Sequence, residues 1–172
     1  KPINSVDDMV GLKMRVPDIK AYLESAQALG AKPTQIAWGE TYLALQQGVV
    51  DACESPMDSM YTMKFYEPTK NIIVTEHIRD NMMVIINAAK FNSLSDKQKE
   101  ALVAASKEAG DWYSAQVKEK ENEFVELMKA EGTKFTKIDT EPMKQKVAEA
   151  AKKLEKEGLW REGLFEAIQS LK

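Results

Sequence analysis

The chain has 172 residues, of which 44% are hydrophobic and 30% charged, a composition typical of a globular domain with a core of its own. A net charge of −3 argues against nucleic acid as a partner, because binding to phosphates needs basic patches. Cys53 is the only cysteine, so no disulfide forms within the chain, and no apolar run approaches the roughly 20 residues that cross a bilayer.

The amino terminus has no recognisable signal peptide, and it begins with Lys1 rather than Met. This start suggests that the sequence derives from a longer precursor by processing or truncation.

The first half of the chain alternates short strand and helix patterns. The expected elements are a turn at 6–9 capped by Ser5, strands at 12–16, 33–37, 49–53, 71–75 and 82–87, and helices at 19–29, 39–47 and 56–66. This alternation at short intervals predicts an α/β fold with parallel strand pairing. The stretch 82–87 reads MMVIIN, and its continuous apolar character predicts a central strand.

The second half is dominated by one long helix. Ser95 and Gln98 form a capping-box pattern, and from there to about residue 131 only Gly110 interrupts good helix formers. At 1.5 Å per residue this helix is about 54 Å long, which exceeds what a single small domain needs. We therefore expect it to lie against two bodies. A strand at 133–138 and helices at 142–156 and 160–171 complete the chain.

Arg15 is the first candidate for a binding residue. It is one of three arginines and lies in the apolar strand of GLKMRVP. The planar guanidinium matches a carboxylate through two parallel hydrogen bonds. Judged by spacing alone, a structural ion pair with Glu40 or Glu54 is the more common arrangement.

Trp38 lies where a predicted strand meets a helix, so it is either the wall of a ligand site or, more commonly for a single aromatic residue, part of the core. Glu40, Asp51 and Glu54 have the chemistry of acid–base catalysts. Isolated acids near loop ends more often cap helices or pair with arginine.

Cys53 and His77 offer an alternative function, because a thiol and an imidazole would suit a small α/β hydrolase or transferase. An apolar strand around Cys53 favours an inert buried thiol, while His77 fits a ligand hydrogen-bond donor and a structural histidine equally well. One histidine and one cysteine do not make a metal site, and no glycine-rich phosphate loop is present, so no cofactor is expected. A third alternative is a helical interaction module centred on 95–131.

Three stretches together resemble one family. They are GLKMRVP, ALGAKPTQIAWGETYLALQQGVVDACESP and the acid-rich helix beyond Ser95. With the specific pattern E-x-Y-x-x-L-Q-x-G-x-x-D-x-x-E-x-P over 40–56, the chain resembles the substrate-binding proteins of tripartite ATP-independent periplasmic (TRAP) transporters, DctP-like proteins, along essentially its whole length.

The resemblance implies the type II periplasmic-binding-protein fold, in which two α/β lobes close on an organic acid and a long helix spans both. On this basis 1–90 is the second, ligand-binding lobe, 91–172 holds the spanning helix, a short strand and the C-terminal helices, and the N-terminal lobe is absent. The uncovered surface would then favour a homodimer or segment exchange.

The resemblance also implies five ligand contacts. Arg15 is expected to form a bidentate salt bridge with the substrate carboxylate, Trp38 to line the pocket, and Ser55 and His77 to contact polar groups. Asp18 would repel a carboxylate, so it is expected to face a hydroxyl or an amine, or to cap its helix. Related proteins often carry Asn in place of Ser55 and Phe in place of Trp38, which changes the pocket's hydrogen bonding and width.

These expectations define a non-catalytic, periplasmic binding protein that captures a carboxylate-bearing organic acid. It would deliver this acid to a TRAP membrane permease, with no cofactor, no nucleic acid and no membrane insertion of its own. With a single lobe, the chain is expected to bind its substrate weakly or not at all.

Overall fold

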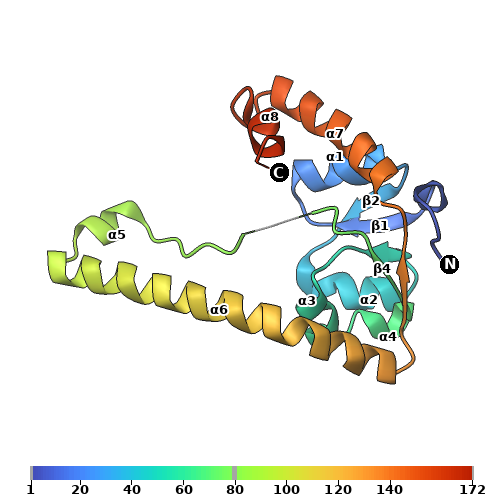
Figure 1. The fold of residues 1–172 in the computed structure, drawn as a ribbon, viewed down its shortest axis with the longest axis horizontal. Coiled ribbons are helices and arrows are strands. Elements are labelled where there is room, and N and C mark those ends of the chain that lie inside the picture. The colour runs from blue at the N-terminus through green and yellow to red at the C-terminus, as the bar shows by residue number, and fades with distance from the viewer. Residues whose placement is uncertain (1, 79–80, 172) are drawn as a thin grey trace.

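Short parallel strands form two sheets in the computed structural model, which describes residues 2–78 and 81–171, with only the backbone of Lys118 (Figure 1). In the first sheet β1 (Lys13–Val16) lies between β2 (Lys32–Gln35) and β3 (Ala52–Cys53), and both pairs are parallel. In the second sheet β4 (Asn71–Val74) pairs in parallel with β5 (Lys134–Lys137). The predicted α/β fold with parallel pairing is confirmed.

Helical segments connect and cover these strands. They are the 3₁₀ turns η1 (Val6–Met9) and η2 (Trp38–Glu40) and the helices α1 (Lys20–Ala28), α2 (Thr41–Gln46), α3 (Met57–Thr62), α4 (Tyr66–Thr69), α5 (Ala88–Asn92), α6 (Asp96–Ala130), α7 (Glu141–Lys156) and α8 (Leu164–Gln169). Most agree with the expected ranges to within a few residues.

Two predicted helices differ from those in the structure. The helix expected at 56–66 is divided into α3 and α4, because Lys64 adopts a left-handed backbone conformation with φ of 58°. Pro68 lies within α4 rather than after a helix, which its ring allows since the first turn of a helix needs no N–H donor. The last helix begins at Leu164 rather than at residue 160, after Gly163 with φ of 76°.

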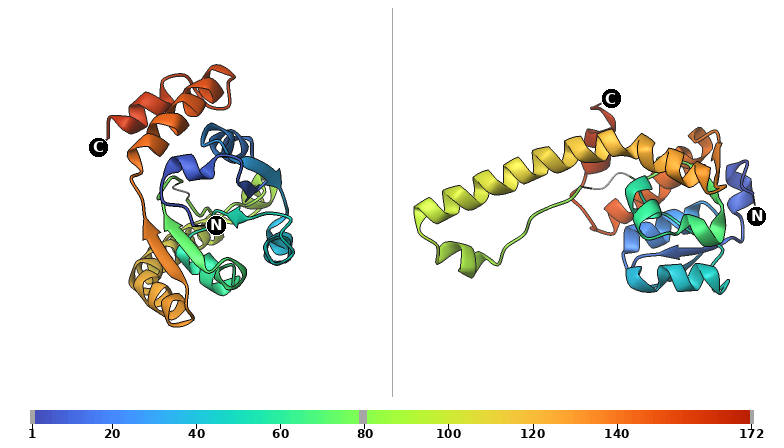
Figure 2. Two further views of the ribbon diagram at one scale, coloured as in Figure 1. Left: turned by 90° about the vertical axis from the view of Figure 1, so that its right-hand side faces the viewer. Right: turned by 90° about the horizontal axis from the view of Figure 1, so that it is seen from below.

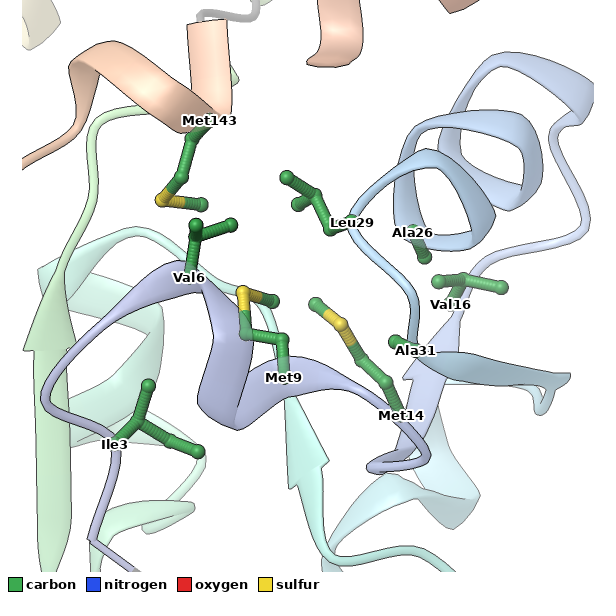
Figure 3. Close-up of a cluster of buried hydrophobic side chains, with 9 residues drawn as sticks. All are labelled: Ile3, Val6, Met9, Met14, Val16, Ala26, Leu29, Ala31 and Met143. Atoms are coloured by element: carbon green, nitrogen blue, oxygen red, sulfur yellow. The ribbon is translucent and has the colours of Figure 1, made fainter.

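The main core lies between β1 and the helices α1 and α7 (Figure 3). Met14 and Val16 of β1 point into it, together with Leu29 from the end of α1 and Met143 of α7. The alternating residues Met14 and Val16 of β1 thus face one apolar layer, and Arg15 lies on the opposite face of the strand.

The chain leaves this lobe and returns to it. After α6 reaches the lobe, β5 pairs with β4 and α7 packs along α1. Ion pairs add to the second contact, with Lys153 Nζ 2.9 Å from a carboxylate oxygen of Glu24 and Lys20 Nζ 2.6 Å from one of Glu157. Elements from beyond residue 91 thus complete the second sheet and the main core. The proposed division at residue 90 stays a prediction.

Helix α6 confirms the long helix, with 35 residues and the predicted capping box of Ser95 and Gln98. Only its C-terminal part packs on the lobe, where Met128 is fully buried beside Tyr66 and Ile72 (Figure 2). Trp112, in the middle of the helix, is 64% exposed. That α6 also lies against a second body stays a prediction. In the described part of the chain, no helix has both the length and the apolar composition of a membrane span.

The prediction of a central strand at 82–87 is wrong. This stretch has no regular structure and runs from the end of β4 towards α5 (Figure 1). Its apolar side chains are exposed, with fractions of 84% for Met82, 79% for Met83, 75% for Val84, 86% for Ile85 and 46% for Ile86. An apolar run matches a strand buried on both faces, but a strand also needs neighbours, and the described residues provide none here.

Leu154 gives a test of the burial of α7. Leu154→Ala removes a side chain that is 2% exposed, and should lower the free energy of unfolding by about 2–5 kcal/mol because it leaves a cavity. Leu171→Ala is the matched control, since Leu171 is 85% exposed and its loss should change stability by less than about 0.5 kcal/mol. Urea unfolding followed by circular dichroism measures both. Equal losses of stability in the two variants would contradict the burial of α7.

Candidate functional site

The carboxyl ends of the parallel strands carry the predicted site residues. Asp18 follows β1, Trp38 follows β2, Ser55 follows β3 and His77 follows β4, while Arg15 lies within β1. Because β1, β2 and β3 are parallel neighbours, their carboxyl ends share one edge of the sheet. In open α/β sheets this edge is where ligands bind.

Arg15 is held from two sides. Its side chain is 4% exposed, and Nε donates a hydrogen bond of 2.9 Å to the carbonyl oxygen of Ile36. Nη1 lies 3.4 Å from Oε1 of Glu54, so of the two acids considered as partners Glu54 forms the ion pair. This contact is long, because charge-assisted N–H···O bonds are usually about 2.7–2.9 Å.

The guanidinium of Arg15 retains hydrogen-bonding capacity. It has five N–H donors, and in the described part of the chain Ile36 and Glu54 are its only hydrogen-bond partners. A carboxylate presented to the remaining donors would complete its coordination.

Trp38 contacts both Arg15 and a core residue. Its ring centroid is 5.3 Å from the guanidinium carbon of Arg15, within the range of a cation–π contact. It also meets the fully buried Phe65 edge to face, with ring centroids 5.0 Å apart. Trp38 nevertheless remains 40% exposed. It is therefore anchored by the core and still offers a surface next to the cation.

Asp18 does not cap α1, which corrects one of the expectations. The N-cap position is Ile19, and no side chain caps the helix. Oδ1 of Asp18 instead accepts a hydrogen bond of 2.6 Å from Nε2 of Gln35, the last residue of β2. Sequence reasoning missed Gln35, although a polar residue at the carboxyl end of a strand was a usable signal.

A cavity of about 150 Å³ opens between β3 and β4, and Ser55 and His77 both line it. The Ser55 hydroxyl is buried and has no hydrogen-bond partner within the described ranges. Thr75, also in the lining, places its hydroxyl 2.7 Å from Nδ1 of His77, and burial lowers the pKa of His77. The sequence analysis did not single out Thr75.

The structure thus divides the predicted residues into groups. Arg15 and Trp38 contact each other on one face of β1, whereas Ser55 and His77 line the cavity that Met14 also lines from the other face. Glu54 links the two groups, because it pairs with Arg15 and also lines the cavity. Asp18 stands apart, bound to Gln35.

Cys53 also lines the cavity, but its chemistry does not suit a nucleophile. Burial raises the pKa of its thiol to about 12; the charge of Glu54 adds to the rise and that of Arg15 opposes it. A thiol that stays protonated at neutral pH is a poor nucleophile. No group of three or more metal-ligating side chains occurs among the residues that the structure describes.

Comparison with known proteins identifies the family. Residues 1–157 match bacterial extracellular solute-binding proteins, family 7, known as DctP. The chain is 42% identical over 145 residues to the sialic acid-binding periplasmic protein SiaP of Vibrio cholerae, an alignment that covers 84% of this chain and 45% of that protein.

Solved structures of TRAP periplasmic solute-binding proteins have the same fold. One from Fusobacterium nucleatum, with bound sn-glycerol-3-phosphate, has a TM-score of 0.89 at 32% identity and covers 99% of this chain and 54% of that one. Another from Roseobacter denitrificans, with bound β-D-glucuronate, has a TM-score of 0.88 at 27% identity and covers 98% and 56%. The chain thus spans about half the length of these proteins.

These relatives are binding proteins and not enzymes, so the alternative of a hydrolase or transferase using Cys53 and His77 is not supported. The match covers the lobe and most of the long-helix half together. The resemblance seen in the sequence is confirmed: the chain belongs to family 7 of the bacterial extracellular solute-binding proteins, the DctP family of TRAP transporter binding proteins.

Proposed function

We propose that this chain forms one face of a binding site for a small organic acid, with Arg15 as the residue that holds the acid group. The observation that carries the proposal is the state of its guanidinium. It is buried, in contact with Trp38, and loosely paired with Glu54 at 3.4 Å. A buried cation is costly unless anions surround it closely, so a ligand carboxylate would gain a strong partner here.

The relatives agree with this chemistry. The Vibrio cholerae protein is named for sialic acid, and the two structures hold glucuronate and sn-glycerol-3-phosphate, all of which carry an anionic acid group. An arginine, unlike a lysine, meets such a group with two parallel donors. The proposed ligand of this chain is therefore a small acid whose carboxylate meets Arg15.

The remaining site residues would contact other parts of the ligand. Trp38 would form a flat wall beside the carboxylate, and its indole is wider than the Phe ring common in the family. The buried Ser55 hydroxyl and the His77 ring would contact polar groups that reach the cavity. Asp18, kept in place by Gln35, would accept a hydrogen bond from a hydroxyl of the ligand.

Family membership supports the physiological role. We propose that the protein acts in the periplasm, closes around its acid between two lobes, and presents the closed form to the membrane permease of a TRAP transporter.

The chain by itself should bind such acids weakly. One face of a two-lobed site supplies only part of the contacts, so glucuronate and sialic acid should bind with a Kd in the millimolar range, about 4 kcal/mol of binding free energy. Titration calorimetry tests this directly. Micromolar binding by the 172-residue chain would contradict it.

Arg15→Lys tests the anchor. The indole N–H resonance of Trp38, assigned by its loss in Trp38→Phe, should shift on addition of millimolar glucuronate. Arg15→Lys should weaken that response at least about tenfold, because the two-donor contact worth roughly 1.5–3 kcal/mol is lost. Arg161→Lys is the matched control, as Arg161 is exposed and far along the chain, and should leave the response unchanged. Equal shifts of the Trp38 resonance in the two variants would contradict a role for Arg15 in the binding site.

Thiol labelling separates binding protein from enzyme. Because burial raises the pKa of Cys53 to about 12, an aromatic disulfide reagent should label it far more slowly in the native chain than in urea at the same pH. A labelling rate in the native chain equal to the rate in urea would contradict a buried, inert thiol and would support Cys53 as a nucleophile.

A further inference from the structure

Two polar side chains are bound to each other at the sheet edge beside Arg15. Asp18 follows β1, Gln35 is the last residue of β2, and Oδ1 of Asp18 accepts a hydrogen bond of 2.6 Å from Nε2 of Gln35. We call Asp18 and Gln35 the edge pair. The residue after Gln35 is Ile36, whose carbonyl oxygen accepts the hydrogen bond from Nε of Arg15. Adjacent residues of one segment therefore hold the arginine and the edge pair.

The carboxylate of Asp18 keeps its charge in this arrangement. Arg15 pairs with Glu54, whereas the partner of Asp18 is the uncharged amide of Gln35. The hydrogen bond therefore fixes the position of the Asp18 carboxylate without neutralising it. A ligand held by Arg15 would lie near a negative charge of fixed position.

The edge pair and Arg15 have opposite hydrogen-bonding character. A guanidinium only donates hydrogen bonds, and a carboxylate only accepts them. The amide of Gln35 uses its nitrogen on Asp18, and its other polar atom is a carbonyl oxygen, which is also an acceptor. Arg15 therefore suits the acid group of a ligand, and the edge pair suits a group that carries a proton.

One ligand can reach both places. Asp18 stands three residues after Arg15, roughly 10 Å along an extended chain, a length comparable with that of an extended sugar acid. A hydroxyl or an ammonium group at the far end of such an acid would donate to the edge pair. A second carboxylate there would have no proton to donate and would meet a like charge.

We propose that Asp18, positioned by Gln35, selects the class of acid that this site accepts. The preferred ligand has one carboxylate and a hydroxyl or ammonium donor at its other end, and a dicarboxylate is disfavoured. This inference rests on the proposed function, because it takes Arg15 as the residue that holds the carboxylate. Asp18 is then a specificity-determining residue and Gln35 a positioning residue.

Three probes that differ only at C6 test the role of charge. D-Gluconate ends in a hydroxyl, D-glucarate in a carboxylate and 6-amino-6-deoxy-D-gluconate in an ammonium group. Each is titrated at the same ionic strength while the indole resonance of Trp38 is followed. Glucarate should bind at least about fivefold more weakly than gluconate, and the amino derivative at least as tightly as gluconate.

The outcomes separate this inference from the proposed function. Equal affinities for gluconate and glucarate, or an amino derivative that binds as weakly as glucarate, would overturn the selection by Asp18 and leave Arg15 as the anchor. A Trp38 resonance that shifts with none of the three acids would contradict the proposed function, and this inference with it.

Asp18→Asn assigns the selection to one side chain, because it removes the charge and keeps the size and an acceptor oxygen. The preference for gluconate over glucarate should fall to less than about twofold. Asp111→Asn is the matched control, since it changes the net charge equally on α6, where Asp111 pairs with Lys107, and it should keep the preference. An unchanged preference in Asp18→Asn would refute the proposal.

Gln35→Ala tests the positioning role. Both members of the edge pair are exposed, so this variant should unfold at the same urea concentration as the native chain. It should nevertheless lower the preference for gluconate over glucarate, because the carboxylate of Asp18 is then free to turn away. A preference equal to that of the native chain would contradict the role of Gln35.

Discussion

The buried guanidinium of Arg15 is the constraint around which this lobe is arranged. Strand alternation in β1 sends Met14 and Val16 into the core below α1 and α7, and it necessarily turns Arg15 to the other face. A charge in that position costs several kcal/mol unless polar or aromatic groups meet it. The Ile36 carbonyl, the Trp38 ring and the Glu54 carboxylate provide this environment, and each comes from the carboxyl end of a neighbouring strand.

In the proposed site, Glu54 would determine how strongly Arg15 holds a ligand. A short, two-donor pair with Glu54 would satisfy the cation and leave little for an acid from outside. The observed contact is a single one, with Nη1 of Arg15 3.4 Å from Oε1 of Glu54. Glu54 therefore offsets the positive charge without pairing with two N–H donors of the guanidinium at once. The same carboxylate lines the cavity and helps to raise the pKa of Cys53. In the proposed site, an incoming carboxylate would approach Arg15 on the side of Trp38, because an approach past Glu54 would meet a like charge.

Local signals in the sequence were sufficient for much of the fold. The cap at Ser5, the capping box of Ser95 and Gln98 and the short alternating strand and helix patterns each depend on residues a few positions apart. The errors involve partners distant in the sequence. A run such as MMVIIN describes a side-chain pattern but not whether a strand lies beside it, and Gln35 became relevant only through its bond to Asp18. The gathering of methionines in one cavity is likewise a consequence of tertiary structure.

Within the described ranges, helix α6 is anchored to the lobe at its C-terminal end only. Its last turns are fixed by Met128, by the pairing of β5 with β4 that follows, and by the hydrogen bond from the Tyr66 hydroxyl to Glu131. These contacts hold the helix rigidly at one end, while Trp112 and Val103 farther along remain exposed. A rigid helix fixed at one end carries any body docked on its free part as a single unit. The strand β4 pairs with β5 at this fixed end and also lines the cavity that holds Ser55 and His77, so the anchoring of α6 and the cavity depend on the same strand.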